Sequence, residues 1–209
     1  FPMSELQTAT EKIFANKNLF EESLQYGLTR GDTELIQLIT ERMNRIENMK
    51  ITEHNMLIVT GCQQGISLCA TALVNNGDTI LIEKPSYLDG LNAMLPYEPN
   101  IVGVDTDDAG IQIDALESAI NANPNTKIVY VIPNFQNPTG KAWPLSRRLE
   151  FLNFMSQPQY QHITILEDNP YGEVRFRGEH LPCLKALDKN GQVIYLSLIH
   201  ISEPTRLQL

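Results

Sequence analysis

An acid and a phenol follow one apolar run of the sequence. Residues 162–166 are typical of a buried strand, and Glu167-Asp168-Asn169-Pro170-Tyr171 comes directly after them. Asp and Asn disfavour strands and Pro cannot continue a central one, so we expect the strand to end here and to present Asp168 and Tyr171 at its carboxyl end. Open α/β sheets bind ligands at that edge. An ionised carboxylate held there needs a positive partner, and the protonated ring nitrogen of a cofactor would serve.

A rigid loop follows a second apolar run. Residues 127–132 are typical of a strand, and Pro133-Asn134-Phe135-Gln136-Asn137-Pro138-Thr139-Gly140 comes next. Two prolines, a glycine and two asparagines restrict this loop, which can aim the Asn137 amide at a ligand oxygen. Taken alone, Asn-Pro-Thr-Gly is more often a plain turn. After a buried strand, and together with Asp168 and Tyr171, it indicates a ligand site.

Two further segments connect a strand to a helix. The first, Thr60-Gly61-Cys62-Gln63-Gln64-Gly65, has glycines that let backbone N–H groups approach a phosphate at a helix N-terminus. Its spacing is neither that of a Walker loop nor Gly-x-Gly-x-x-Gly, so a simple turn is the alternative. The second, Glu83-Lys84-Pro85-Ser86-Tyr87, ends in an aromatic ring that can stack on a flat ligand or pack at the start of a helix.

With these motifs in this order, the chain resembles the fold-type I pyridoxal-phosphate enzymes. Within them it is similar to the class I/II aminotransferases of the 2-aminoadipate and aromatic aminotransferase type. The resemblance extends from Gln25-Tyr26-Gly27 to Val193-Ile194-Tyr195-Leu196. It implies pyridoxal 5′-phosphate as the cofactor and places Tyr26 near the substrate entrance.

The resemblance also implies a role for each residue of the motifs. Asp168 would keep the pyridine nitrogen protonated, which makes the ring an electron sink. Tyr87 would stack on the ring, and Asn137 and Tyr171 would hydrogen-bond its hydroxyl oxygen. The residues carried over as phosphate contacts are Gly61, Cys62 and Gln63.

The Schiff-base lysine of the family has no counterpart in the sequence. The family places it just beyond the strand that matches residues 193–196, whereas this chain has no lysine after Lys189, and Ile201 falls near the expected position. Residues 197–209 do not match the family pattern, and Phe1-Pro2-Met3 does not resemble a natural start. We therefore expect a fragment of an aminotransferase, truncated before that lysine, without a catalytic residue and inactive as given.

The elements that position these residues form an α/β pattern. Beyond Met56, short apolar runs alternate with helical patterns, which predicts a mainly parallel sheet with helices on both faces. We expect an N-terminal helical segment over residues 1–50, an incomplete cofactor-binding domain over 51–196 and an unrelated tail over 197–209. Strands are predicted over 57–59, 79–82, 101–104, 127–132, 162–166 and 193–196, with a further short strand and turn over 173–178. Helices are predicted over 4–15, 33–46, 64–74, 87–95, 114–121 and 145–156.

Composition restricts the partners. The 209 residues carry a formal charge of -9, from 16 Lys+Arg against 25 Asp+Glu, and such a balance argues against nucleic acid or an anionic membrane. The three cysteines, Cys62, Cys69 and Cys183, have no metal-ligand spacing and fit a reducing compartment, so we expect a cytoplasmic protein. Amino acids and 2-oxo acids are the substrates that the resemblance implies, and a homodimer is the expected state of the parent enzyme.

Three functions compete at this stage. The leading one is transfer of an amino group between an amino acid and a 2-oxo acid. The alternative is an aminotransferase-like domain that senses an effector in a transcriptional regulator; those relatives usually carry an Asp-Asp-Tyr-Asp-like segment where this chain has Asp168-Asn169-Pro170-Tyr171. A nucleotide-binding α/β domain is the third, and it lacks the expected glycine fingerprint.

Overall fold

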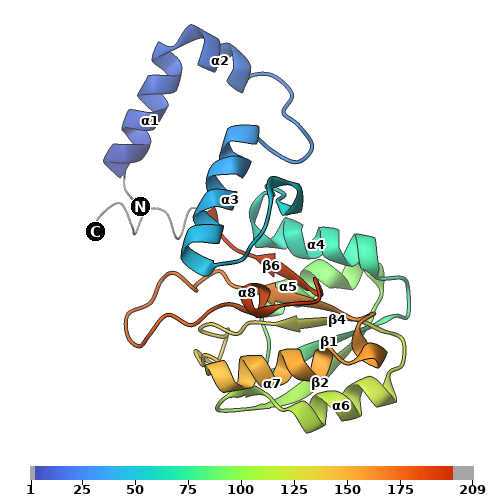
Figure 1. Ribbon diagram of the computed structural model, residues 1–209. Coiled ribbons are helices and arrows are strands. Elements are labelled where there is room, and N and C mark those ends of the chain that lie inside the picture. Colours follow the sequence, from blue (N-terminus) through green and yellow to red (C-terminus); the bar gives the residue numbers. More distant parts are fainter. Residues whose placement is uncertain (1–2, 200–209) are drawn as a thin grey trace.

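The computed structural model describes residues 3–199 and consists of a twisted sheet with helices packed on it (Figure 1). The sheet has six strands in the order β3-β2-β1-β4-β5-β6. Neighbouring strands are parallel except β2 and β3, which pair antiparallel at one edge. The strands are β1 (Thr79–Lys84), β2 (Asn100–Asp107), β3 (Gly110–Ile111), β4 (Thr126–Val131), β5 (Thr164–Asp168) and β6 (Val193–Leu196). The helices are α1 (Met3–Ala15), α2 (Lys17–Ser23), α3 (Thr33–Glu47), α4 (Gly61–Leu73), α5 (Leu88–Met94), α6 (Ile113–Ala122), α7 (Leu145–Met155) and α8 (Leu184–Leu187).

This architecture confirms the α/β fold class, and it corrects two of the predicted strands. Residues 57–59 form no strand, because the backbone bond from the Ile58 N–H to the Arg30 carbonyl, at 3.0 Å, is not continued into a ladder. Residues 173–178 form turns and irregular backbone, and the side chain of Phe176 is almost fully exposed.

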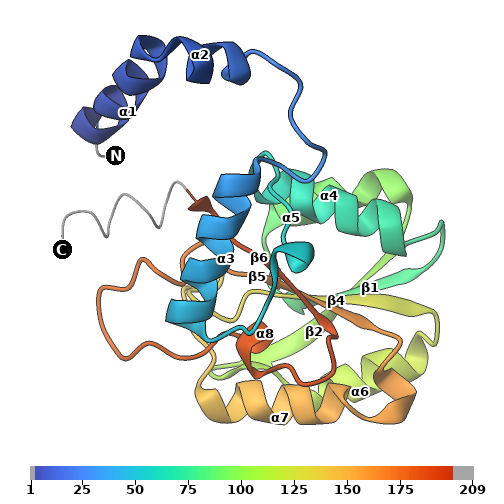
Figure 2. The ribbon, with the colours of Figure 1, turned by 45° about the horizontal axis from the view of Figure 1, so that its top comes forward.

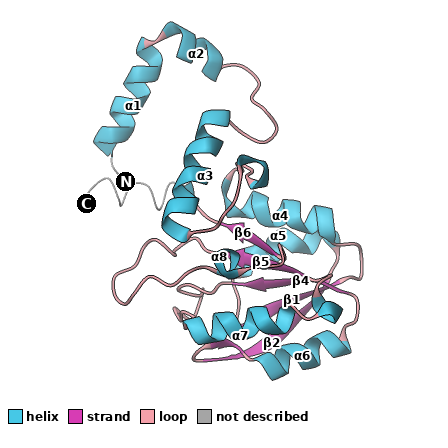
Figure 3. Ribbon diagram, in the orientation of Figure 1, coloured by secondary structure: helices cyan, strands magenta, loops and turns pink. Residues whose placement is uncertain are grey.

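Helices cover both faces of the sheet because its strands are apolar on both sides (Figure 3). On one face, α6 and α7 pack against the sheet through residues such as Leu116 and Phe151. On the other face, α4 and α5 pack against it through Ile66 and Met94. Strands β1, β4 and β5 lie between two cores, and their side chains are almost entirely buried.

The N-terminal helices differ in how they are held. Helix α3 packs through Met43 onto Met49 and Cys183, and its Arg42 forms an ion pair with Glu173 in which both side chains are nearly buried. Helices α1 and α2 stand away from the sheet, and neither contributes a buried residue (Figure 2). Within residues 3–199, we find no helix with the combination of length and apolarity that a bilayer crossing requires.

The strand order contains a reversal of winding. Strand β1 lies between β2 and β4 in the sheet. From β1 the chain adds β2 and β3 on one side, and it then adds β4, β5 and β6 on the other, so the direction of winding reverses between β1 and β4. In open α/β sheets, ligands bind beyond the carboxyl ends of the strands at such a reversal. Here those ends lead into the segments that carry Tyr87, Asn137 and Asp168.

Candidate functional site

Asp168 is the last residue of β5 and is almost completely buried, with 2% of its surface exposed. Its Oδ2 accepts a hydrogen bond of 2.7 Å from the Tyr130 hydroxyl on the neighbouring strand β4. Its Oδ1 is buried and accepts no hydrogen bond of normal geometry from the described residues, because the nearby Cys62 thiol is directed at the Ser197 carbonyl. Burial raises the pKa of Asp168, while the Tyr130 hydroxyl and the Cys62 thiol oppose that shift. A buried carboxylate oxygen without a donor is suited to a ligand that brings a charged N–H group.

Cys62 lies beside Asp168 in the first turn of α4. Burial, and then the negative charge of Asp168, raise the pKa of the Cys62 thiol to about 12, so the thiol keeps its proton at neutral pH. Its S–H group points at the Ser197 carbonyl, with an S···O distance of 3.7 Å. Cys62 is therefore a neutral donor in this structure, not a nucleophile.

Helix α4 starts at Gly61 in open space. Gly61 has φ +77°, a left-handed conformation that favours glycine, and a Cβ placed on it would meet no atom within 4 Å. The first N–H groups of a helix have no partners within the helix, and they attract anions. Gln63 is exposed in the same turn. The start of α4 thus has the accessible backbone that a phosphate contact needs.

Tyr87 leads from β1 into α5 and is half-buried. Burial is the main cause that raises the pKa of Tyr87, the nearby Gln63 side chain lowers it, and the negative charge of Asp168 adds to the rise. Gly90 allows the two tyrosines of the site to approach, because a Cβ on Gly90 would lie 2.9 Å from the Tyr130 hydroxyl oxygen and 3.1 Å from Tyr87 Cδ1.

Asn137 lies half-buried in the loop after β4, and its bond to Pro138 is cis. The neighbouring Gln136 fixes this loop: its Nε2 donates to the Pro85 carbonyl at 2.7 Å, and its Oε1 accepts from the Thr139 N–H at 2.9 Å. The loop after β4 is therefore tied to the segment after β1 that carries Tyr87.

The structure unites only part of the residues predicted for the site. Cys62, Gln63, Tyr87 and Asp168 interact with one another, and Gly61 begins the same helix turn. Tyr171 is 38% exposed in the turn after Asp168. Tyr26 is fully exposed in the segment between α2 and α3, apart from the other residues. The Ile201 position, expected near the Schiff-base lysine, lies outside the described residues, and the roles assigned to all of these residues remain predictions.

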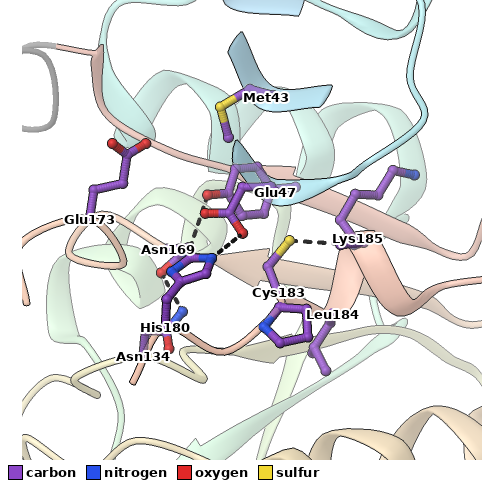
Figure 4. A network of polar contacts seen from close by, with 12 residues as sticks. Met43, Glu47, Asn134, Asn169, Glu173, His180, Cys183, Leu184 and Lys185 are labelled. Atoms are coloured by element: carbon purple, nitrogen blue, oxygen red, sulfur yellow. Dashed lines mark hydrogen bonds and ion pairs between the residues drawn. The ribbon is translucent and has the colours of Figure 1, made fainter. Parts of the chain in front are cut away.

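Sequence reasoning missed the buried polar groups that support the site. Tyr130 donates to Asp168, and Glu83 at the end of β1 accepts from the Ile132 N–H at 2.8 Å and from Trp143 Nε1 at 3.0 Å. Burial raises the pKa of Glu83 to about 7. The side chains of Asn134 and Asn169, the residue after Asp168, bond to each other (Figure 4). The available signal was weak: a hydroxyl or a carboxyl in an otherwise aliphatic strand indicates an internal partner but does not name it.

The residues present fit pyridoxal phosphate. Asp168 has an unpartnered, buried oxygen for the ring nitrogen, Tyr87 offers a half-buried ring beside it, and the start of α4 offers backbone donors for a phosphate. No group of His, Cys, Asp and Glu that could hold a metal ion occurs among residues 3–199.

Comparison with known proteins gives a consistent assignment. Residues 3–181 match the family model described as "Aminotransferase class I and II". The aromatic-amino-acid aminotransferase 1 of Thermococcus litoralis is 38% identical over 94% of this chain and 47% of its own length. The 2-aminoadipate transaminase of Thermus thermophilus is 31% identical over 94% of this chain and 47% of its own length.

Solved structures agree with the sequence relatives. The kynurenine aminotransferase of Pyrococcus horikoshii, in complex with PMP (pyridoxamine phosphate), superposes with a TM-score of 0.85 at 33% identity, over 94% of this chain and 48% of that one. The chain thus spans about half the length of the proteins it matches. On the match to 3–181, and on the parallel sheet with Asp168 at its carboxyl edge, the chain belongs to the class I and II aminotransferases, a family of pyridoxal-phosphate-dependent transferases.

Proposed function

We propose that this chain supplies the pyridoxal-phosphate-binding half of an aminotransferase that moves an amino group between an amino acid and a 2-oxo acid. The observation that carries the proposal is the buried, unpartnered Oδ1 of Asp168. A structural carboxylate with this burial would have a donor on each oxygen, as the Glu167 carboxylate has from the Leu184 and Lys185 N–H groups at 2.8 and 2.9 Å.

In this proposal the side chains bind and orient the cofactor. Asp168 holds a proton on the pyridine nitrogen by ion pairing, and the Tyr130 hydroxyl fixes the direction of the carboxylate. Tyr87 covers the ring, and Asn137 and Tyr171 hold its hydroxyl oxygen. Gly61, Cys62 and Gln63 bind the phosphate through the start of α4. When bound, the protonated ring supplies an electron sink for a carbanion at the substrate α-carbon.

The test is noncovalent binding of pyridoxamine phosphate, which requires no lysine. We expect the chain to bind it in a fluorescence titration, and Asp168→Asn to weaken binding by at least about tenfold, because loss of one charge-assisted bond costs roughly 1.5–3 kcal/mol. Asp105→Asn is the matched control, since Asp105 is exposed and pairs with the exposed Lys84. Equal affinity of the Asp168 and Asp105 variants would contradict the proposal.

The remaining features of the proposal concern the setting of the protein. We propose a cytoplasmic parent enzyme that is a homodimer and binds neither nucleic acid nor membrane. The charge of -9 supports the last point, and the three free thiols support a reducing compartment. The division into residues 1–50, 51–196 and 197–209 also remains a proposal.

The alternative of an effector-sensing regulator domain has weaker support. A helix-turn-helix-type regulator of Bacillus subtilis, YisV, is 30% identical over 88% of this chain, whereas the family model and the relatives reported above are aminotransferases. Pyridoxamine phosphate binding alone does not separate the two functions. Transamination by the natural full-length protein would decide for the enzyme.

A further inference from the structure

A hydrogen-bonded series of buried polar side chains connects the carboxyl ends of three strands beside the candidate site. The Arg148 guanidinium on α7 donates to Asn134 Oδ1 at 2.6 Å, and Asn134 Nδ2 donates to Asn169 Oδ1 at 2.9 Å. Asn169 Nδ2 then donates to the Tyr195 hydroxyl oxygen at 2.9 Å. Asn134 follows β4, Asn169 follows β5 and Tyr195 lies in β6. Figure 4 shows the bond between the Asn134 and Asn169 amides.

Arg148 determines which way the amide groups of this hydrogen-bonded series point. A guanidinium has donors only, so the amide oxygen of Asn134 must face it, and the Asn134 nitrogen must face Asn169. The same logic then turns the Asn169 nitrogen towards Tyr195. Each amide therefore has one orientation that satisfies both of its neighbours, and the three strand ends are connected in a single register.

Arg148 also binds the backbone on both sides of the site. It donates to the Pro133 and Trp143 carbonyls, at 3.2 and 3.0 Å, near the two ends of the loop that carries Asn137. It donates to the Pro182 carbonyl at 3.0 Å, at the end of the segment that begins with Tyr171. One side chain thus fixes the distance between two loops that are separate in sequence.

Burying the Arg148 guanidinium costs free energy, which indicates that Arg148 does more than fill space in the core. Arg148 is 0% exposed, and the hydrogen-bond acceptors around it are carbonyl and amide oxygens, which carry no full charge. A buried cation without a directly bonded carboxylate is expensive, and burial lowers the pKa of Arg148 accordingly. An apolar residue of similar volume would pack the same space at lower cost, but it would not connect the two loops.

The backbone of the turn after Asp168 packs closely against the Asn169 side-chain amide. A Cβ on Gly172 would overlap the Asn169 side chain, so the backbone lies directly against the amide. The Asn169 N–H donates to the Leu196 carbonyl of β6 at 2.9 Å. Because Asn169 follows Asp168 directly, any shift of the amide would move the carboxylate.

We propose that Arg148, Asn134 and Asn169 are positioning residues, which hold the Asn137 loop, Asp168 and the Tyr171 segment in one fixed geometry. None of the three needs to touch a ligand. The identity of the ligand, pyridoxal phosphate or pyridoxamine phosphate, rests on the proposed function, whereas the coupling of the two loops does not.

Arg148→Met tests the coupling, with Arg147→Met as the matched control on the same helix. Arg147 is bound to Asp107 at 2.9 Å and to Glu150 at 3.0 Å. Because Lys141 reaches the Asp107 carbonyl at 3.5 Å, the first loop is read without that residue. Hydrogen exchange read by mass spectrometry should show at least about tenfold faster exchange in both 134–140 and 169–182 for the Arg148 variant. For the Arg147 variant, acceleration should be confined to 107–111 and α7. Faster exchange in only one loop, or equal patterns in the two variants, would overturn the proposal.

A milder variant covers the case in which Arg148→Met does not fold. Tyr195→Phe removes a single oxygen and leaves Asn169 Nδ2 without its acceptor. It should accelerate exchange in 169–182 first and weaken pyridoxamine phosphate binding about three- to tenfold, with Arg147→Met unchanged within about twofold. Arg148→Lys should restore part of the affinity lost in Arg148→Met.

The outcomes separate the two proposals. If the wild-type chain binds no pyridoxamine phosphate, the proposed function fails, and the exchange pattern still decides the coupling. If the wild type binds it and the two loops exchange independently in the Arg148 variant, the positioning role fails and the proposed function stands.

Discussion

At the level of single residues, the candidate site depends on the two unlike oxygens of Asp168. One oxygen is held by the Tyr130 hydroxyl at 2.7 Å, and the other is buried without a partner. The first bond fixes the direction of the carboxylate and the second oxygen is left for a ligand. Residues that keep Tyr130 in place therefore influence the site without belonging to it.

Gly90 is such a residue. In Gly90→Ala the new methyl group would meet the Tyr130 hydroxyl, which is buried and cannot move aside without leaving Asp168. Overpacking costs about 1–3 kcal/mol, and the better helix propensity of Ala offsets up to about 1 kcal/mol of it. We expect a net loss of about 1 kcal/mol in urea denaturation and weaker pyridoxamine phosphate binding.

Gly27→Ala is the control for this substitution, because a Cβ on Gly27 meets no atom within 4 Å. It should change the free energy of unfolding by less than about 0.5 kcal/mol. A Gly90 variant as stable as the Gly27 variant, with unchanged binding, would show that Tyr130 is not held as described.

The sequence was sufficient to predict Asp168 as a site residue, but it was not sufficient to predict the residues that bond to Asp168. An acid that ends an apolar strand is unusual enough to be singled out, and the structure buries it there. Tyr130 occupies an ordinary strand position, and its partner is 38 residues away on another strand. A contact of this kind is set by strand order and register, which local patterns do not contain.

At the level of elements, buried carboxylates join the strand ends to the loops after them. Glu83 of β1 accepts from the Ile132 N–H that follows β4, and Glu167 of β5 accepts from the Leu184 N–H at the start of α8. Burial raises the pKa of each carboxyl to about 7 against these hydrogen bonds. Both groups therefore titrate near neutral pH.

This shift predicts that stability decreases as pH rises through this range. The folded state holds more protons than the unfolded state between pH 4.5 and about 7, so the stabilisation is complete below 4.5 and is lost as pH rises through 7. At about 1.4 kcal/mol per pKa unit, each carboxyl accounts for roughly 3 kcal/mol over that range. Urea denaturation at pH 5.5 and pH 8 should give the higher free energy of unfolding at pH 5.5.

Glu83→Gln should reduce this pH dependence, because Gln does not titrate, whereas the exposed Glu150→Gln should leave it unchanged. A free energy of unfolding that is flat or rising from pH 5.5 to pH 8 would be inconsistent with these pKa shifts.

Hydrophobic patterns gave wrong strand predictions where strand pairing, and not the local sequence, determines whether a strand forms. Residues 79–82 and 127–132 became strands because each run has partners on both sides. Residues 57–59 are just as apolar, but three residues with one backbone bond to Arg30 do not make a strand. The periodicity of apolar residues indicates that a segment can be buried, whereas hydrogen bonding to a neighbouring strand determines whether the segment joins a sheet.

At the level of the whole molecule, the helices before residue 24 are the least integrated part of the described structure. Neither α1 nor α2 buries a residue, and the figures show them clear of the sheet. Segments with few buried contacts open most easily. We expect trypsin to cleave first after Lys12 and Lys17, and the product to keep the cooperative unfolding transition of the intact chain.

The outcome that would contradict this expectation is a first cut within residues 79–196, detected by mass spectrometry of early digestion products. The lysines of that region supply the internal comparison: Lys127 is half-buried in β4, a strand with paired neighbours on both sides.

The central claim is that Asp168 is an ion-pair partner for a pyridine nitrogen. The most direct measurement is the nitrogen-15 NMR spectrum of ring-labelled pyridoxamine phosphate bound to the chain, recorded from pH 6 to pH 9. We expect the bound ring nitrogen of the wild type to stay protonated over that range, and that of Asp168→Asn to lose its proton as the free ligand does. A bound nitrogen that titrates like the free ligand in the wild type, or that does not differ between the two proteins, would contradict the account.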